Sequence, residues 1–224
     1  MNKGIFWTVG SCVGFMALVL GLFLNQWTTP RDLSAEEYKD LGVYFIEPSR
    51  NLTKLTLVDD TNSYFKFDDF KGKWNVLFFG FTFCPDICPL TMRQLQEIKK
   101  DLGDDSEKVR FFLVSVDPIR DTPEKLRVYL DNFDEDFIGL TGGIDQVYKF
   151  ATQVNVPFTP VVESEDPFYT VDHTGSLVLI DPEGKYAGFF RAPHDSAKVL
   201  LALESLLNRN QEVFYYFWFP FIAK

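Results

Sequence analysis

The pattern of apolar and polar positions divides the chain into four parts. Residues 5–24 form an uncharged apolar run of twenty residues, which as a helix is about 30 Å long and can cross the core of a bilayer. A polar segment, a long segment that mixes apolar and polar residues, and a short aromatic segment follow it. We therefore predict a transmembrane anchor over residues 1–27, a polar stalk over residues 28–50, a globular domain over residues 51–208 and an aromatic tail over residues 209–224.

The apolar run favours an anchor over two alternatives. A cleaved signal peptide has a shorter apolar core and a small-x-small cleavage site after it, and no such site follows this run. Residues 9–12 resemble a lipoprotein acylation site, but the apolar run continues for twelve residues beyond Cys12. Trp7 and Trp27 flank the run, as aromatic side chains do at a membrane interface.

Strands and helices alternate along the predicted globular domain. Residues 74–83 and 109–116 are apolar on both faces, which is typical of buried strands in a parallel sheet. Further strands are predicted at residues 52–58 and 137–140 and in a hairpin of residues 171–180 and 185–190, and helices at residues 85–102, 121–133, 144–154 and from Asp195 or Ser196 to Leu207. The run Asp121-Thr122-Pro123-Glu124 is a strong helix start signal, with a capping residue followed by an early proline. Leu90, Leu95 and Ile98 are expected on the inward face of the helix at residues 85–102. Residues 155–170 are predicted to be irregular.

This order of elements predicts an α/β fold. Helices between strands, followed by a hairpin and a last helix, indicate a sandwich with a mixed central sheet. The order matches a thioredoxin-like core with an insertion, preceded here by the one transmembrane helix. The net charge of −10 argues against nucleic acid as a partner, and is compatible with docking to a basic protein surface or simply with solubility.

Two of the three cysteines, Cys84 and Cys88, lie at the predicted junction of the first buried strand and its helix. Thiols one helical turn apart have Cβ atoms roughly 5–6 Å apart, so the pair can hold one soft metal ion or form a disulfide. Such a site suits an oxidising compartment. With no transit sequence before the anchor, we expect a bacterial inner-membrane protein with its soluble domain on the periplasmic side. Cys12 is interpreted as a small apolar residue in lipid.

Seven motifs resemble one known family over about residues 50–205. They are Gly72-Lys73, Phe79-Gly80-Phe81-Thr82, Cys84-Pro85-Asp86 with Cys88-Pro89, Ser115-Val116-Asp117-Pro118, Arg120-Asp121-Thr122-Pro123, Gly139-Leu140-Thr141-Gly142 and Val171-Asp172-His173-Thr174. In this order they resemble the Sco/SenC family, membrane-tethered copper proteins that are needed to build the dinuclear copper centre of cytochrome c oxidase.

The resemblance implies that Cys84, Cys88 and His173 bind one copper ion per chain, as Cu(I) or Cu(II). From the residues alone, His173 is either a structural histidine or a ligand; a ligand is favoured if it begins a strand that approaches the dithiol. Asp172 is a candidate to orient the imidazole. Asp86 has the same candidate role, although a simple complement to the helix dipole is preferred. Asp117 is expected to shape a turn, and His194 to be exposed before the last helix.

The leading hypothesis is a copper chaperone, a binding and transfer protein and not a turnover enzyme, that delivers copper to the copper-bearing subunit of the oxidase. Other copper carriers, thioredoxin-like reductases and the membrane are expected as further partners. The alternative is a thiol–disulfide oxidoreductase with Cys84 and Cys88 as the redox pair, against which the CxxxC spacing counts mildly. A peroxidase and a copper-responsive redox sensor are weaker alternatives. The aromatic tail either packs on the domain or lies at the membrane interface.

Overall fold

The structure is a computed structural model that describes residues 3–28, 33–161, 163–166 and 168–218, with side chains described for residues 7–24, 33–161, 163–166 and 168–208. It divides into two compact units. The larger unit is Leu33–Leu207, and the other contains the described residues before and after it.

A mixed eight-stranded sheet runs through the larger unit in the order β1-β8-β7-β4-β5-β6-β2-β3. Strand β4 pairs in parallel with β5, and β5 with β6, whereas the other neighbours are antiparallel. The strands are β1 (Val43–Arg50), β2 (Leu57–Asp59), β3 (Tyr64–Phe65), β4 (Trp74–Gly80), β5 (Val109–Ser115), β6 (Ile138–Gly142), β7 (Leu177–Ile180) and β8 (Tyr186–Phe190). The predicted α/β class with a mixed sheet is confirmed.

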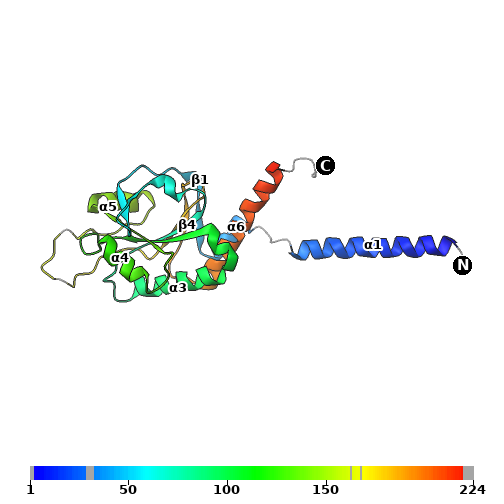
Figure 1. Ribbon diagram of the computed structural model, residues 1–224, viewed down its shortest axis with the longest axis horizontal. Helices are drawn as coiled ribbons and strands as arrows, with labels where there is room; N and C mark the ends of the chain where they lie inside the picture. The colour runs from blue at the N-terminus through cyan, green and yellow to red at the C-terminus, as the bar shows by residue number, and fades with distance from the viewer. Residues whose placement is uncertain (1–2, 29–32, 162, 167, 219–224) are drawn as a thin grey trace. The chain divides into compact units, whose positions relative to one another are not determined.

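Helices cover both faces of the central strands. All seven residues of β4 are buried, as its apolar sequence predicts for a strand covered on both sides. Helices α3 (Ile87–Asp101) and α4 (Pro123–Leu130) connect the parallel strands and lie on one side of β4 in Figure 1, with α5 (Ile144–Gln153) on the other. Right-handed crossovers that step in one direction across a sheet place both helices on the same face. The ring of Phe79 contacts Phe150 of α5 on the opposite face.

The helix start signals in the sequence act as expected. Thr122 caps α4 by accepting a hydrogen bond from the amide of Lys125, and Pro123 occupies the first turn, where no amide hydrogen is needed. The carboxylate of Asp195 accepts hydrogen bonds from the amides of Ala197 and Lys198 at the start of α6 (Ser196–Trp218). That helix continues past Leu207, where the sequence predicted its end.

The predicted stalk over residues 28–50 is wrong over residues 33–50. Short helix α2 (Ala35–Asp40) and strand β1 belong to the larger unit, because β1 pairs with β8 at the edge of the sheet. Tyr38 is buried and donates a hydrogen bond to the side chain of Ser205 in α6 over 2.8 Å. The globular unit therefore begins at Leu33 and not at residue 51.

Smaller corrections concern where elements begin and which way they face. Leu90 was expected on the inner face of its helix but is 52% exposed, and the buried positions of α3 are Cys88, Thr91, Met92, Leu95 and Ile98. The strand predicted from residue 171 begins only at Leu177, and the one predicted from residue 52 begins at Leu57. Two 3-10 turns, η1 (Phe67–Phe70) and η2 (Gly103–Lys108), complete the larger unit.

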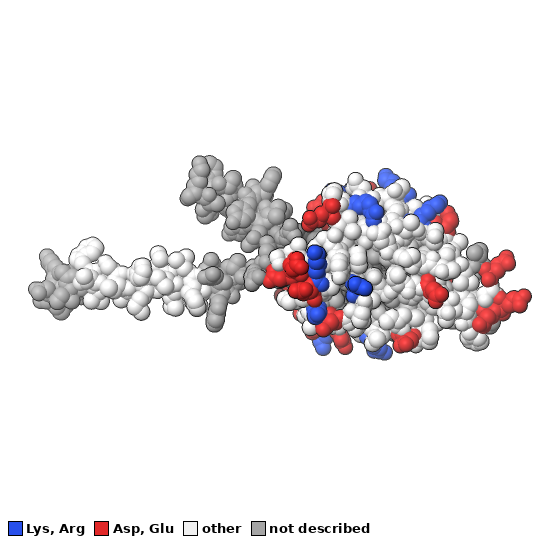
Figure 2. Space-filling model, turned by 180° about the vertical axis from the view of Figure 1, so that it is seen from behind, with Lys and Arg blue, Asp and Glu red and all other residues white. Residues whose placement is uncertain are grey.

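The N-terminal helix α1 (Lys3–Thr28) contains Trp7–Leu24, a stretch long and apolar enough to cross a membrane. Backbone of α6 is helical through Trp218, but the side chains of the predicted aromatic tail, residues 209–224, lie outside the described side chains, so its two interpretations stay predictions. On the face of the molecule shown in Figure 2, acidic and basic side chains are interspersed around a broad uncharged area.

The position of β1 predicts which fragment is stable. A soluble fragment of residues 51–208 lacks Tyr38 and Val43, which are 2% and 1% exposed, and leaves the edge of β8 unpaired. Each lost burial costs about 1.5 kcal/mol or more, so its free energy of unfolding should lie at least about 3 kcal/mol below that of residues 33–208. Urea unfolding of both fragments, followed by circular dichroism, measures the difference; equal midpoints would contradict it.

Candidate metal centre

Two thiols and one imidazole meet at one end of the central strands. The ligand atoms of Cys84, Cys88 and His173 all lie within 4.8 Å of one another. The sulfur of Cys88 is 3.7 Å from Nε2 of His173, and both cysteines are free thiols. The structure thus brings together the three residues that the sequence singled out, from two segments far apart in the chain.

The two cysteines follow β4 in a tight connection to α3. The amide of Cys84 donates to the carbonyl of Phe81 over 3.2 Å, and the amide of Cys88, in the first turn of α3, donates to the sulfur of Cys84 over 3.4 Å. A backbone amide and a helix N-terminus both favour negative charge on a nearby sulfur. Cys84 is half-buried, whereas Cys88 is fully buried.

Burial decides the protonation of the two inner groups. It raises the pKa of the Cys88 thiol far above the ordinary value, and the hydrogen bond with Cys84 acts in the same direction. Burial lowers the pKa of His173, against the opposing effects of the Thr174 carbonyl and the charge of Asp172. The metal-free site therefore contains a neutral thiol and a neutral imidazole at pH 7, and binding a cation must release the proton of Cys88.

The imidazole of His173 is held in one orientation. Its Nδ1 lies 3.1 Å from the carbonyl oxygen of Thr174, so the proton is on Nδ1 and the lone pair of Nε2 faces Cys88. The rings of Phe78 and Phe81 meet its ring edge to face, each with centroids 5.9 Å away. His173 does not begin a strand as expected; it forms an isolated bridge with Phe158.

Gly80, the last residue of β4, makes room for the buried sulfur. A Cβ at this position would lie 3.0 Å from Sγ of Cys88 and 2.7 Å from Cε1 of Phe78, both closer than atoms normally pack. In the sequence, Gly80 stands out only as part of a family motif. No local pattern in the sequence indicates this contact, since it depends on how α3 lies across β4.

A buried carboxylate fastens the cysteine loop to the rest of the site. Asp121 is fully buried and accepts hydrogen bonds from the amide and hydroxyl of Thr82, over 3.0 and 2.5 Å, and from the hydroxyl of Ser115 over 2.7 Å. Burial raises its pKa, while these bonds oppose the shift. In the sequence, Asp121 belongs to a helix start signal and to one family motif, and neither indicates this role.

The other predicted residues have more modest places. Asp172 and Asp86 are both exposed, and Asp86 stands at the start of α3, where its charge complements the helix dipole. His194 was expected to be exposed but is half-buried, with Nε2 2.6 Å from the carbonyl oxygen of Gly175. Cys12 lies in α1, outside the unit that contains the site.

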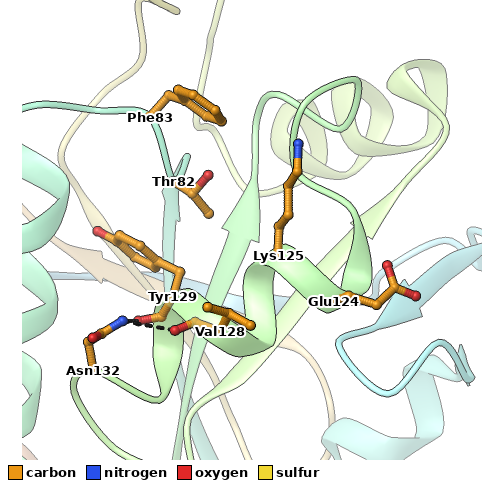
Figure 3. A pocket seen from close by; sticks show the side chains of 7 residues that line it. All are labelled: Thr82, Phe83, Glu124, Lys125, Val128, Tyr129 and Asn132. Carbon is orange, nitrogen blue, oxygen red and sulfur yellow. Dashed lines mark hydrogen bonds between the residues drawn. The ribbon is translucent and has the colours of Figure 1, made fainter.

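An open pocket of about 470 Å³ lies beside the cysteine loop (Figure 3). Its lining residues are Thr82, Phe83, Glu124, Lys125, Val128, Tyr129 and Asn132. Phe83 directly precedes Cys84 and is 50% exposed. The pocket therefore borders the cysteine loop at Thr82 and Phe83, the two residues before Cys84.

The family model of SCO1/SenC matches residues 46–208. The chain belongs to the SCO1/SenC family. A protein of Stutzerimonas stutzeri is 39% identical over 153 residues, which cover 68% of this chain and 74% of that protein. The mitochondrial SCO1 homolog of Homo sapiens is 33% identical over 176 residues, which cover 78% of this chain and 57% of the human protein. The chain thus spans little more than half of that relative.

Solved structures of this family share the fold of the larger unit. Arabidopsis thaliana ScoI, solved with copper bound, has a TM-score of 0.63 and 31% identity over 70% of this chain and 96% of its own. Bradyrhizobium japonicum ScoI, also with copper bound, has a TM-score of 0.60 and 33% identity over 69% and 96%. BsSco, a member of the Sco family of cytochrome c oxidase assembly proteins, is 21% identical over 71% and 95%, with a TM-score of 0.56, and shows the fold alone.

The close contact at Gly80 predicts a sharp effect of one methyl group. In Gly80→Ala the new Cβ must displace Phe78 or the Cys88 sulfur, and overpacking of this kind costs about 1–3 kcal/mol of the free energy of unfolding. Urea unfolding of the metal-free fragment 33–208 measures the cost. Gly175→Ala is the matched control, because its Cβ would meet only Ala192, at an ordinary 3.4 Å. Equal free energies of unfolding for the two variants would contradict the prediction and show that the packing around Cys88 can accommodate a methyl group.

Proposed function

We propose that this protein is a membrane-tethered copper chaperone that delivers copper to the dinuclear copper site of cytochrome c oxidase. The observation that carries the proposal is the meeting of two thiols and an imidazole nitrogen within 4.8 Å, in a chain whose family relatives were solved with copper bound. Thiolate sulfur is the preferred ligand of soft Cu(I), and imidazole suits both Cu(I) and Cu(II). The donor set fits copper in either oxidation state.

The surroundings of the three donors support transfer over permanent storage. Cys88 is fully buried, whereas Cys84 and His173 are half-buried, and Phe83, the residue before Cys84, lines an open pocket. A thiol of an acceptor protein can therefore approach from the Cys84 side and replace one ligand at a time. Stepwise exchange keeps the ion bound by sulfur throughout, and the chain itself undergoes no net chemical change. A binding and transfer protein, not a turnover enzyme, fits this site best.

Location follows from the anchor and the chemistry together. Helix α1 is long and apolar enough to hold the protein at a membrane. A pair of free thiols that handles copper suits the oxidising side of that membrane, so we place the soluble unit in the periplasm of a bacterium, attached to the inner membrane. The partner there is the copper-bearing subunit of the oxidase, with other copper carriers as donors.

The geometry also supports the alternative, a thiol–disulfide oxidoreductase acting on the cysteines of the oxidase copper site. Cys84 is the accessible thiol, and the amide of Cys88 points at its sulfur. Its thiolate would attack the partner disulfide and release one partner thiol; Cys88 would then give up its proton, displace the second partner thiol and close a Cys84–Cys88 disulfide. Two electrons pass to the partner, which is reduced. Thioredoxin-like reductases would restore the dithiol.

A count of bound copper in fragment 33–208 tests the main proposal. The parent should bind one copper per chain and show thiolate-to-Cu(II) charge-transfer absorption, which should vanish in Cys84→Ser and Cys88→Ser. His173→Ala should weaken binding by at least about tenfold, as loss of a metal ligand does. The matched control is His194→Ala, which removes the other histidine, whose Nε2 faces a carbonyl oxygen, and should bind copper as the parent does.

The same variants separate the two functions. If His173→Ala holds copper as tightly as the parent, the copper site is wrong. If His173→Ala also reduces a disulfide peptide at the parental rate while Cys88→Ser does not, the oxidoreductase becomes the better description. Delivery itself is measured by mixing the loaded fragment with the copper-free, reduced soluble domain of the oxidase subunit and following the metal between the two proteins.

A further inference from the structure

His173 lies on a long connection between α5 and β7, whereas Cys84 lies between β4 and α3 and Cys88 in the first turn of α3. Near His173, the bridge to Phe158 and the hydrogen bond from the Thr159 amide to the Asp172 carbonyl join two parts of this same connection. These contacts do not tie it to the cysteine loop. The imidazole contacts Phe78 and Phe81 through its ring, but holding the backbone of its loop against the cysteine loop takes a further contact.

Tyr169, on the same connection as His173, forms such a contact with the turn that follows β5. The hydroxyl of Tyr169 donates to Oδ1 of Asp117 over 2.7 Å, and its carbonyl oxygen accepts from Nη2 of Arg120 over 2.9 Å. Asp117 and Arg120 also form an ion pair, with side chains that are 1% and 12% exposed. Both the backbone and the side chain of Tyr169, four residues before His173, are thus fixed to this turn.

The cysteine loop is fixed to the same turn. The guanidinium carbon of Arg120 lies 3.5 Å from the ring centroid of Tyr169 and 4.8 Å from that of Phe83, the residue before Cys84. A guanidinium between two aromatic rings is held by cation–π attraction and stacking. The side chain of Arg120 therefore contacts Tyr169 in the segment of His173 and Phe83 in the segment of Cys84.

A chain of hydrogen bonds reinforces this connection through the turn. From Thr82 it passes to Asp121, then to the hydroxyl of Ser115, which accepts from the amide of Asp117 over 3.0 Å. Asp117 in turn accepts from Tyr169. Asp121 and Asp117 are buried, so water competes little for these bonds and the network resists deformation.

We propose that Arg120 is a positioning residue of the metal centre, which holds the loop of His173 against the loop of Cys84 through Tyr169 and Phe83. The contacts described above join it to residues near the three donors and not to the donors themselves. The inference rests on the copper binding proposed above, and adds that the rate of copper release is set by this turn. Groups that orient metal ligands typically change metal affinity by about 10- to 100-fold when they are removed.

The test measures how fast copper leaves loaded fragment 33–208 for an excess of a Cu(I) chelator. Arg120→Gln should still bind one copper but release it about tenfold faster; Arg120→Lys should restore little, because it lacks the planar fork. Tyr169→Phe removes one hydroxyl and should release copper about threefold faster. The matched control is Arg127→Gln, which breaks another ion pair with a buried carboxylate, Asp60, and should release copper at the parental rate.

A double variant separates positioning from loss of stability. If Arg120 acts through the imidazole, Arg120→Gln should not accelerate release in the His173→Ala background. Parental release rates in both Arg120→Gln and Tyr169→Phe would overturn the inference, and so would an undiminished effect without the imidazole. Should Arg120→Gln fail to fold, Tyr169→Phe with the same double variant decides alone. A parent that binds no copper would instead refute the proposed function.

Discussion

The antiparallel pairing of β4 with β7 is the contact on which the candidate metal centre depends. Phe78 near the end of β4 lies opposite Leu177 at the start of β7. Because the strands run in opposite directions, the residues that follow β4 and those that precede β7 meet at the same end of the sheet. Cys84 and His173 are among these residues. The central sheet thus brings donors from distant parts of the chain to one place, and the loops determine the final distances between the donor atoms.

Burial gives this site its chemical character. A fully buried thiol and a half-buried imidazole are both neutral without metal, since a lone charge is expensive away from water. A bound cation supplies the missing partner charge, so loss of the Cys88 proton and binding of the ion occur together. Cys84 is half-buried and thus more exposed than Cys88. The proposed copper transfer and the alternative disulfide exchange both use this difference in exposure between two thiols one helical turn apart.

Polar residues at the end of β5 show how a small site is held without a large cavity. Ser115, Asp117 and Asp121 are buried; Asp117 accepts a hydrogen bond from Tyr169 and Asp121 from Thr82, while Ser115 donates to Asp121 within the same turn. Burying carboxylates is costly unless their oxygens are paired. Here the carboxylates are paired with an arginine, a tyrosine, two further hydroxyl groups and the amide of Thr82, and the result is a turn that contacts both ligand-bearing loops. Apolar packing alone would not specify the direction of each loop so closely.

Local patterns in the sequence determined a good part of this description. Continuous apolar runs predicted β4 and β5, the Thr122-Pro123 pair predicted the start of α4, and the CxxxC spacing placed two thiols on one turn of helix, because each depends only on residues near one another in the chain. The resemblance carried by the CPDICP and VDHT segments named the family and the third donor, although the role of these donors in copper binding stays a prediction.

Only the tertiary structure decided the features that join distant segments. Strand β1 belongs to the sheet because it pairs with β8. This partner lies near the other end of the chain, so residues 33–50 look like a stalk when only neighbouring residues are considered. His194 turns inward to Gly175, and Gly80 is small because Cys88 packs on it, for reasons that no periodicity shows. In the sequence Arg120 is only part of a family motif, and folding placed two aromatic rings against it. Periodicity records which face of an element is buried, but the identity of the contact across that face exists only once the chain has folded.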